Sequence, residues 1–375
     1  IGVAQHSGFI DACIRQGIRG KQEKEKIILW VIYPGLLSNV VGDAGYIILL
    51  PIAATLFHSV GLHPVAGIIT AYASVACGYS ANVVLSTMDP LLARTTEEAA
   101  VAGGIEHGDT GPLCNYYFMF VSTFLIAAVV YWVTRRKLLP AMGNYGGSTL
   151  FEGYKPLSRR ALTMAIIVGV AYVAVVLWLT FSSYGILRGV SGNLMRSPFI
   201  MGILFLISLG AGLMGMIYGF SSGRYRTDAD VIEGLAQPMK LLGVYFVIAF
   251  FAAQMFACFE YSHLDKCLAI MGANLLSSIE FGNLSTLILF ILFSALINLI
   301  MVSATSKWTF MAFIFIPIFD KMGVSPDVVQ CAFRIGDSAT NAITPFLFYM
   351  PLVLTYMQQY DKNSSYLSLL RYTWR

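Results

Sequence analysis

The feature that most constrains this chain is a long apolar stretch, residues 296–345, that polar residues interrupt twice. The first interruption spans residues 303–307, directly before Trp308, and the second spans residues 334–341, shortly before Thr344 and Pro345. Small hydroxyl residues in an apolar helix mark places where the backbone opens and its carbonyl groups become available. Charges in lipid are costly and are therefore placed where protein or water can neutralise them. Two such breaks in successive segments are typical of transporters that hold a substrate or ion near mid-membrane.

The composition indicates the class of protein. Hydrophobic residues make up 57% of the 375 residues and charged residues 12%, against roughly 25% charged residues in soluble domains. A helix needs about 20 apolar residues to cross a bilayer, and several stretches qualify. We therefore predict an all-α polytopic membrane protein. The net charge of +4 is ordinary for such a protein, because basic residues gather in cytoplasmic loops, and it gives no indication of nucleic-acid binding.

The sequence contains no pattern that suggests an enzyme or a metal site. The six cysteines form no C-x-x-C pair and lie mostly in apolar runs, where cysteine behaves as a small hydrophobe. Neither a Ser/His/Asp set nor a phosphate-binding loop is present. We expect no bound cofactor, and any active transport would have to draw on an ion gradient. A channel is a further alternative. However, the chain contains two similar units, described below, and buried charges in two units of opposite orientation favour alternating access over a continuous pore.

The chain divides into three parts. Residues 1–114 are predicted to hold the end of a first hairpin and two broken helices, 27–60 and 64–88. Residues 115–240 contain clean membrane spans that we interpret as scaffold and dimerisation helices. Residues 241–375 are predicted to hold a re-entrant hairpin, 241–278, and two broken helices, 285–320 and 327–357. The first residues resemble neither a signal peptide nor a cytoplasmic leader, which predicts a missing N-terminal piece.

The first and last parts resemble each other. The segment Gly61-Leu-His-Pro64 matches Gly323-Val-Ser-Pro326, and Phe57 matches Phe319 at the same offset. Such a repeat in inverted orientation places the binding site at the interface of the two units. For the orientation, the basic loop 135–160 is predicted to be cytoplasmic. Counting spans from this loop places residues 91–114, an acidic loop, outside and residues 221–240 inside, and it also places the basic residues of 19–26 outside.

Several motifs resemble the p-aminobenzoyl-glutamate transporter (AbgT) family, and the match covers essentially the whole chain. They are Ser38-Asn39 with Gly45-Tyr46, residues 63–67, residues 78–82 with 88–93, residues 114–119, Ser303-Ala304 with Trp308, and residues 334–338 with Thr340-Asn341 and Thr344-Pro345. The resemblance implies a homodimeric secondary carrier of the bacterial inner membrane, coupled to Na⁺ or H⁺. Its expected substrates are p-aminobenzoyl-glutamate or exported sulfonamide antimetabolites.

By motif match, the functional residues of the family fall on Asp89, Asn298, Trp308, Pro326, Arg334 and Asp337. The sequence also departs from the family. Residues 40–43 differ from its usual Thr-Ala-Ser-Glu, so that Asp43 takes the place of the glutamate, and Lys307 replaces a residue that is usually glutamine. An additional cation beside the break bears directly on which ion is coupled.

Two chemical roles are open for Arg334 and Asp337, which are three residues apart. In one, Asp337 neutralises Arg334 in a structural ion pair. In the other, the planar guanidinium binds a substrate carboxylate, while Asp337 ligates a cation or carries a proton. Asp89 precedes Pro90 and could either terminate a helix or belong to the site. Trp308 could stack on the p-aminobenzoyl ring or simply pack in the core.

Asparagines recur near the breaks, at positions 39, 82, 298 and 341. Their amide oxygens would suit Na⁺, most directly near Ser303 and Asn341, but each amide could instead hydrogen-bond between helices. We therefore interpret Asn39, Asn82 and Asn341, with Asp89 and Asp337, as candidates for ion coupling. Trp308, Arg334, Asn298, Pro326 and Asp89 are candidates for substrate binding. The closest alternative function is a Na⁺-coupled carrier of dicarboxylates or other organic anions on the same plan.

Overall fold

The computed structural model describes residues 2–17, 24–41, 44–83, 85–86, 88–105, 111, 113–143, 145, 158–182, 185–189, 197–236 and 282–374, with scattered positions from 247 to 271. Within these residues the structure is helical and contains no strand. This confirms the prediction of an all-α fold for that part of the chain. Apart from those scattered positions, the re-entrant hairpin predicted at 241–278 lies outside the described residues, as does Asp43.

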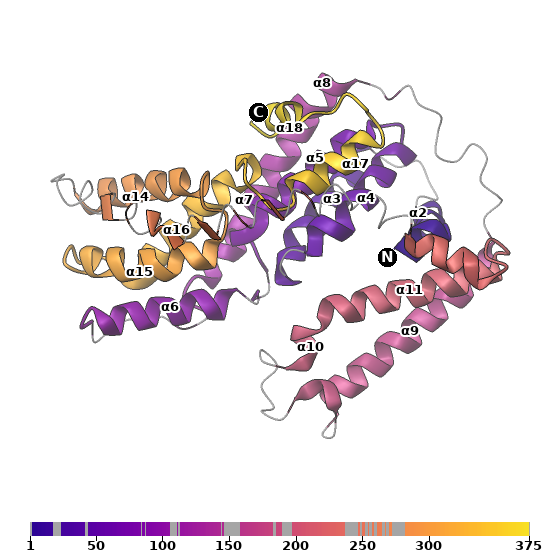
Figure 1. Cartoon of the computed structure of the whole chain (residues 1–375), viewed down its shortest axis with the longest axis horizontal. Coiled ribbons are helices and arrows are strands. Elements are labelled where there is room, and N and C mark those ends of the chain that lie inside the picture. Colours follow the sequence, from indigo (N-terminus) through magenta and orange to yellow (C-terminus); the bar gives the residue numbers. More distant parts are fainter. Residues whose placement is uncertain are drawn as a thin grey trace.

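The helices fall into three groups along the chain (Figure 1). The first comprises α1 (Gly2–His6), α2 (Phe9–Gly17), α3 (Lys24–Leu37), α4 (Ala44–Ser59), α5 (Pro64–Cys77) and α6 (Asp89–Ala102). The second comprises α7 (Tyr116–Val133), α8 (Leu139–Met142), α9 (Arg159–Phe181), α10 (Pro198–Met201) and α11 (Ile203–Ser221). The third comprises α14 (Asn283–Asn298), α15 (Ala304–Asp320), α16 (Pro326–Thr340), α17 (Met350–Gln358) and α18 (Tyr366–Thr373).

Helices α3 and α4 form an antiparallel hairpin. A Cβ atom on Gly35 of α3 would lie 3.3 Å from the Leu49 side chain of α4, and one on Gly45 would lie 2.1 Å from Ser38 Oγ. Residues near the connection therefore face each other, while the outer ends of the two helices lie at the same end of the pair. The Asn39 side chain donates to the free carbonyl of Leu36 (3.2 Å) at the end of α3, which satisfies backbone groups where the chain reverses.

Helices α14 and α15 form a second hairpin of the same kind. Asn283 Nδ2, at the start of α14, donates to the carbonyl of Met322 just beyond the end of α15 (2.8 Å). Deeper in the pair, the ring of Phe290 packs on Phe315 at 4.8 Å and on Phe319 at 5.3 Å. The predicted interruptions of 27–60 and 285–320 are present, since α3 ends at Leu37 and α14 ends at Asn298. Each segment then turns back on itself instead of continuing in one direction. Their polar residues cap helix ends at the turn, as Ser303 does for the N–H of Ser306 (3.4 Å).

A tight turn of the same geometry follows each hairpin. Gly61 and Gly323 both have positive φ, +73° and +76°, a conformation that glycine adopts without strain. Leu62 N–H donates to Phe57 and Val324 N–H donates to Phe319, each across five residues of chain. Pro64 and Pro326 then begin α5 and α16. The sequence correspondence between these two turns is thus confirmed.

Helix α6 of the first group packs against the third group, and α17 of the third group packs against the first. Helix α6 contacts α15 and α16, whereas α17 contacts α4 and α5, and Figure 1 shows α6 beside α15 and α17 beside α4. An irregular segment allows each of these two helices to reach the other group. The 3-10 turn Gly78–Ser80 precedes α6, and the 3-10 turn Asn341–Ile343 precedes α17. The break predicted over residues 334–341 begins only at its last residue, because α16 continues to Thr340 and the 3-10 turn starts at Asn341.

Helix α6 corrects a further prediction, since it occupies much of the segment 91–114 that we expected to be an acidic loop. Its buried face consists of Asp89, Leu92, Ala93, Thr96, Ala99 and Ala100. Its exposed face carries an Arg94–Glu98 ion pair with a 2.8 Å separation, a spacing of four residues that supports a helix. This amphipathic helix contains no long apolar run, because its buried face is largely alanine and threonine and its exposed face is charged.

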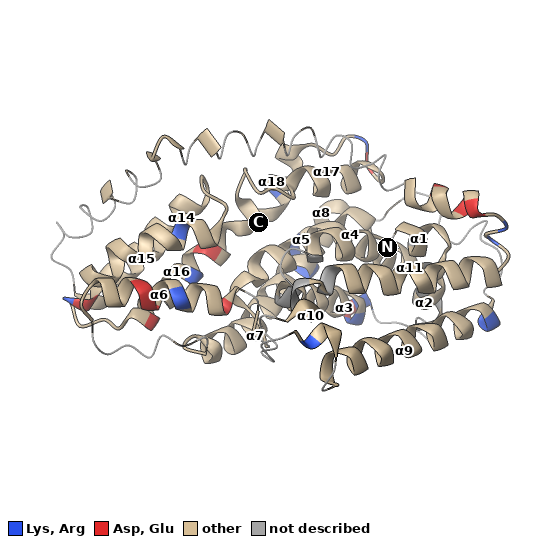
Figure 2. Cartoon of the chain, turned by 60° about the horizontal axis from the view of Figure 1, so that its bottom comes forward, with Lys and Arg blue, Asp and Glu red and all other residues tan. Residues whose placement is uncertain are grey.

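Two described helices, Tyr116–Met142 and Arg159–Phe181, are long and apolar enough to cross a membrane, with mean hydropathies of 1.8 and 2.5. Most of the ribbon in Figure 2 carries neither acidic nor basic residues. An ion pair between Glu25 and Arg135 (2.6 Å) places the start of α3 beside the C-terminal end of α7. The predicted placement of 19–26 on the side opposite to 135–160 is therefore wrong for Lys24–Lys26, because α3 and α4 form a hairpin instead of a single span.

Candidate functional site

The turns of the two hairpins meet at one cavity of about 160 Å³. Asn39 reaches it from the α3–α4 connection, and Ser303 and Thr305 reach it from the α14–α15 connection. Asp337 and Asn341 line it from α16 and the following 3-10 turn. The remaining lining is largely apolar and aromatic: Tyr46, Val75, Ala76, Tyr79, Met88, Val302, Ala304, Leu347, Phe348 and Tyr349. The cavity thus combines a carboxylate, amides and hydroxyl groups with aromatic rings.

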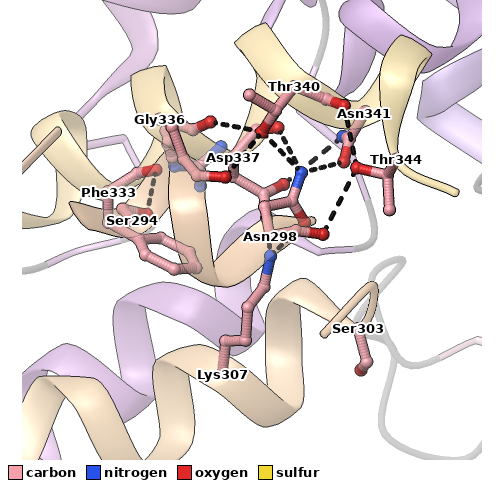
Figure 3. Close-up of polar contacts among 12 residues, drawn as sticks. Ser294, Asn298, Ser303, Lys307, Phe333, Gly336, Asp337, Thr340, Asn341 and Thr344 are labelled. Carbon is pink, nitrogen blue, oxygen red and sulfur yellow. Dashed lines mark hydrogen bonds and ion pairs between the residues drawn. The ribbon is translucent and has the colours of Figure 1, made fainter. Parts of the chain in front are cut away.

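A buried ion pair adjoins this cavity (Figure 3). Lys307 Nζ on α15 binds Asp337 Oδ1 on α16, and it also donates to Asn298 Oδ1 at the end of α14. Lys307 and Asn298 are fully buried, and Asp337 is 1% exposed. The ammonium group also lies 5.8 Å from the centre of the Phe333 ring. A charge removed from water in this way requires a partner of opposite sign and satisfied hydrogen bonds, and Asp337 supplies the opposite charge.

The amide of Asn298 ties this ion pair to the end of α16. Its Nδ2 donates to the carbonyl of Asp337 (2.8 Å), to Thr340 Oγ1 (3.0 Å) and to Asn341 Oδ1 (2.7 Å). The Asn341 amide in turn donates to Asp337 Oδ2 (3.4 Å). Thr344 Oγ1 closes the network by contacting the Asn298 carbonyl (3.2 Å). The residues predicted at this break are therefore brought together, with Asn298, Asp337 and Asn341 in one hydrogen-bonded group.

A second buried ion pair joins Arg334 of α16 to Asp89, the first residue of α6. Arg334 Nη1 lies 2.8 Å from Asp89 Oδ1, and both residues are 1% exposed. The other oxygen of Asp89 accepts the backbone N–H of Ser86 (2.6 Å). The expectation that Asp337 neutralises Arg334 is therefore wrong in this structure, and Asp89 begins a helix instead of terminating one. Arg334 does not line the cavity, so a substrate carboxylate there would not contact it in this structure.

Trp308 lies in the core between α6 and α16. Its side chain is fully buried, its ring packs against Phe333 at 4.7 Å, and its indole N–H donates to Thr96 Oγ1 (2.9 Å). Thr96 then donates to Gln330 Oε1 (2.8 Å). Trp308 does not line the cavity, so this geometry favours the packing interpretation over stacking on a substrate ring.

The other predicted site residues are dispersed. Asn39 donates to the Val75 carbonyl (3.0 Å) and lines the cavity, whereas Asn82 is fully buried but is not among the residues that line it. Pro326 begins α16 and is likewise absent from the lining, so it positions the helix instead of contacting a ligand. The sequence prediction missed Thr96 and Gln330, and also the aromatic lining from Tyr79, Phe348 and Tyr349. Gln330 lies about one helical turn before Arg334, and this spacing could have indicated that both side chains lie on the same face of α16.

A model of the AbgT transporter family matches residues 1–372. The chain belongs to the AbgT transporter family. Its members are transporters, and therefore membrane proteins. A p-aminobenzoyl-glutamate transport protein of Escherichia coli (strain K12) is 30% identical over 346 residues, which cover 91% of this chain and 68% of that protein.

Two solved structures of AbgT-family transporters are similar over the whole of this chain. The YdaH transporter of Alcanivorax borkumensis shares 33% identity with a TM-score of 0.59, and this chain covers 79% of it. MtrF of Neisseria gonorrhoeae, described as illuminating a class of antimetabolite efflux pumps, shares 36% identity with a TM-score of 0.56, and this chain covers 75% of it. The family predicted from the motifs is confirmed.

Proposed function

We propose that this AbgT-family protein is an ion-coupled secondary carrier that moves p-aminobenzoyl-glutamate, exports sulfonamide-type antimetabolites, or does both. The relatives support this choice, since one is named for p-aminobenzoyl-glutamate transport and another for antimetabolite efflux. We place the protein in the bacterial inner membrane as a multi-pass homodimer, with the exposed apolar faces of α7 and α9 in contact with lipid or the second subunit.

The observation that carries the proposal is the mixed chemistry of the central cavity. An aromatic amide with carboxylate groups needs apolar rings for its p-aminobenzoyl part and hydrogen-bond donors for its anionic part. Phe348 and the stacked pair Tyr46 and Tyr349, whose rings are 4.6 Å apart, provide the first. Helix α15 begins at the cavity, so that its N-terminal N–H groups and the Thr305 hydroxyl provide the second. Sulfonamides offer the same combination of aryl ring and polar group.

The arrangement of the helices supports alternating access. We interpret α3–α6 and α14–α17 as inverted repeats and the two helical hairpins as re-entrant. The open ends of the hairpins lie toward opposite ends of the core in Figure 1, while their turns meet at one cavity. In inverted-repeat carriers, rocking of one unit against the other exposes a fixed central site to each side in turn. The same site could serve either uptake or export.

The ion that drives transport is part of the proposal. Among the residues predicted for ion coupling, Asp337, Asn341 and Asn39 line the cavity, whereas Asp89 and Asn82 do not. We therefore assign coupling to the group around Asp337, with Na⁺ or H⁺ as the ion. The Arg334–Asp89 pair is assigned to holding α16 against α6.

Ligand binding to the purified protein tests the site directly. Val302→Trp places a large ring in the cavity, whereas Leu296→Trp, at a position 61% exposed on α14, is the matched control. We expect Val302→Trp to weaken p-aminobenzoyl-glutamate and sulfonamide binding at least tenfold and the control to leave both unchanged. Unaltered binding by a folded Val302→Trp protein would show that the cavity is not the site. Tighter binding of succinate than of p-aminobenzoyl-glutamate would instead favour the dicarboxylate carrier.

A further inference from the structure

The Lys307 ammonium group occupies a position that oxygen atoms have already shaped for a cation. Asp337 Oδ1 and Asn298 Oδ1 both face Nζ, and these two residues come from different helices, α16 and α14. Carboxylate and amide carbonyl oxygens are the ligands that hard metal cations prefer. The third direction around the ammonium is covered by the Phe333 ring at 5.8 Å, which also attracts positive charge.

The orientation of these oxygens does not depend on Lys307. Asn298 Nδ2 donates to three oxygens, those of the Asp337 backbone, Thr340 and Asn341, and this fixes Oδ1 on the side facing Nζ. The second oxygen of Asp337 is held by the Asn341 amide (3.4 Å). Removal of the lysine charge would therefore leave a preorganised site with an unneutralised carboxylate.

A free ion could reach this site through the cavity. Asp337 and Asn341 belong both to the network and to the cavity lining. Ser303 and Asn39 also line this cavity. The four-carbon side chain of Lys307 extends from α15, and its ammonium group binds Asp337, which itself lines the cavity.

We propose that Lys307 is a tethered cation that fills the Na⁺-type site formed by Asp337 and Asn298, and that substrate transport by this chain therefore needs no Na⁺. The inference rests on the proposed function for its consequence in transport. Its structural part stands separately, because occupancy of the site can be measured without a substrate. The same geometry predicts that a neutral residue at position 307 opens the site to a free alkali cation.

The experiment compares the thermal unfolding midpoint of purified protein in NaCl and in choline chloride at equal ionic strength. Lys307→Gln shortens the side chain by one atom, removes its charge and supplies another amide oxygen. We expect this variant to gain a saturable Na⁺-specific rise of about 3 °C or more and the wild-type protein to show none. The Lys307→Gln/Asp337→Asn double variant, which lacks both charges, should also show no rise.

Two results would overturn the inference: a Na⁺-specific rise in the wild-type protein, or a folded Lys307→Gln variant without one. If Lys307→Gln does not fold, the wild-type titration decides, because Na⁺-specific stabilisation refutes a filled site and its absence supports one. Binding of p-aminobenzoyl-glutamate to wild-type protein, measured with and without Na⁺, separates the two proposals. Absence of binding in both media would contradict the proposed function, whereas binding that requires Na⁺ would contradict the proposal that Lys307 fills the cation site.

Discussion

Two buried charged residues of α16, Arg334 and Asp337, are neutralised by different parts of the molecule. Arg334 pairs with Asp89 of α6 at 2.8 Å, and Asp337 pairs with Lys307 of α15. Removing one member of a buried pair leaves an uncompensated charge and typically costs about 3–5 kcal/mol, whereas replacing both members by apolar residues is often neutral. The pairing can therefore be tested by single and double substitutions.

Asp89→Asn is expected to destabilise the protein by about 3–5 kcal/mol, because it leaves the Arg334 guanidinium without its counter-charge. Addition of Arg334→Met to Asp89→Asn should restore most of that loss. Addition of Arg334→Met to Asp337→Asn should not, since this double variant leaves both Asp89 and Lys307 unpaired. Chemical unfolding in detergent measures all four proteins. Equal rescue in the two backgrounds would show that Arg334 has no preferred carboxylate.

Aromatic recognition is expected to depend on the cavity lining and not on Trp308. Phe348→Ala should raise the apparent KM for aromatic substrates roughly tenfold, since stacking on one ring contributes about 1–3 kcal/mol, and should spare non-aromatic anions. Trp308→Ala should reduce transport of every substrate alike, because Trp308 is buried against Phe333 and Thr96. Uptake assays with p-aminobenzoyl-glutamate and succinate distinguish these outcomes. A selective aromatic defect at Trp308 would restore the stacking role considered from the sequence.

At the scale of helices, close packing of α14 against α16 positions the site. A Cβ atom on Gly336 would lie 2.5 Å from the Ile291 carbonyl and 2.8 Å from the Ser294 Cβ, so that only a glycine permits this approach. Gly336 directly precedes Asp337, and Asn298 lies at the end of α14. Any separation of these helices would therefore also separate the Asn298 amide from the Asp337 carbonyl and from the Thr340 and Asn341 oxygens that it contacts.

Gly336→Ala should accordingly destabilise the protein by about 1–3 kcal/mol through overpacking and lower the rate of transport. Gly212→Ala in α11 is the matched control, because a Cβ atom there meets nothing within 4 Å and alanine favours a helix. Thermal unfolding and uptake should be measured on both variants. A Gly336→Ala protein as stable and active as the control would mean that this helix contact can relax without consequence.

The sequence predicted the polar breaks and the turns that follow them, but not how the chain passes through each break. An apolar run interrupted by Ser38 and Asn39 has the same pattern whether the helix continues onward or reverses, because both leave the same backbone groups to be capped. The partner of Arg334 could not be predicted either. Asp337 was three residues away in sequence, whereas Asp89 is brought close only by the packing of α6 against α16.

On the scale of the whole molecule, α6 packs against α15 and α16, and α17 packs against α4 and α5. The turns of both hairpins line one cavity. Membership of the AbgT family and the helical class followed from motifs and composition, because these are properties of the linear sequence. The predicted division into residues 1–114, 115–240 and 241–375 stays a prediction, as does the dimer. We propose that this cavity couples substrate movement to an ion gradient through the Asp337 group.

The most direct test is flux of labelled p-aminobenzoyl-glutamate in proteoliposomes with Na⁺ and pH gradients imposed separately. With Lys307 as the resident cation, we predict that a proton gradient drives accumulation above equilibrium and that a Na⁺ gradient alone does not. A folded Asp337→Asn protein should fail to accumulate substrate under either gradient. Equilibration of the substrate without accumulation under both gradients, or accumulation unaffected by Asp337→Asn, would contradict the account.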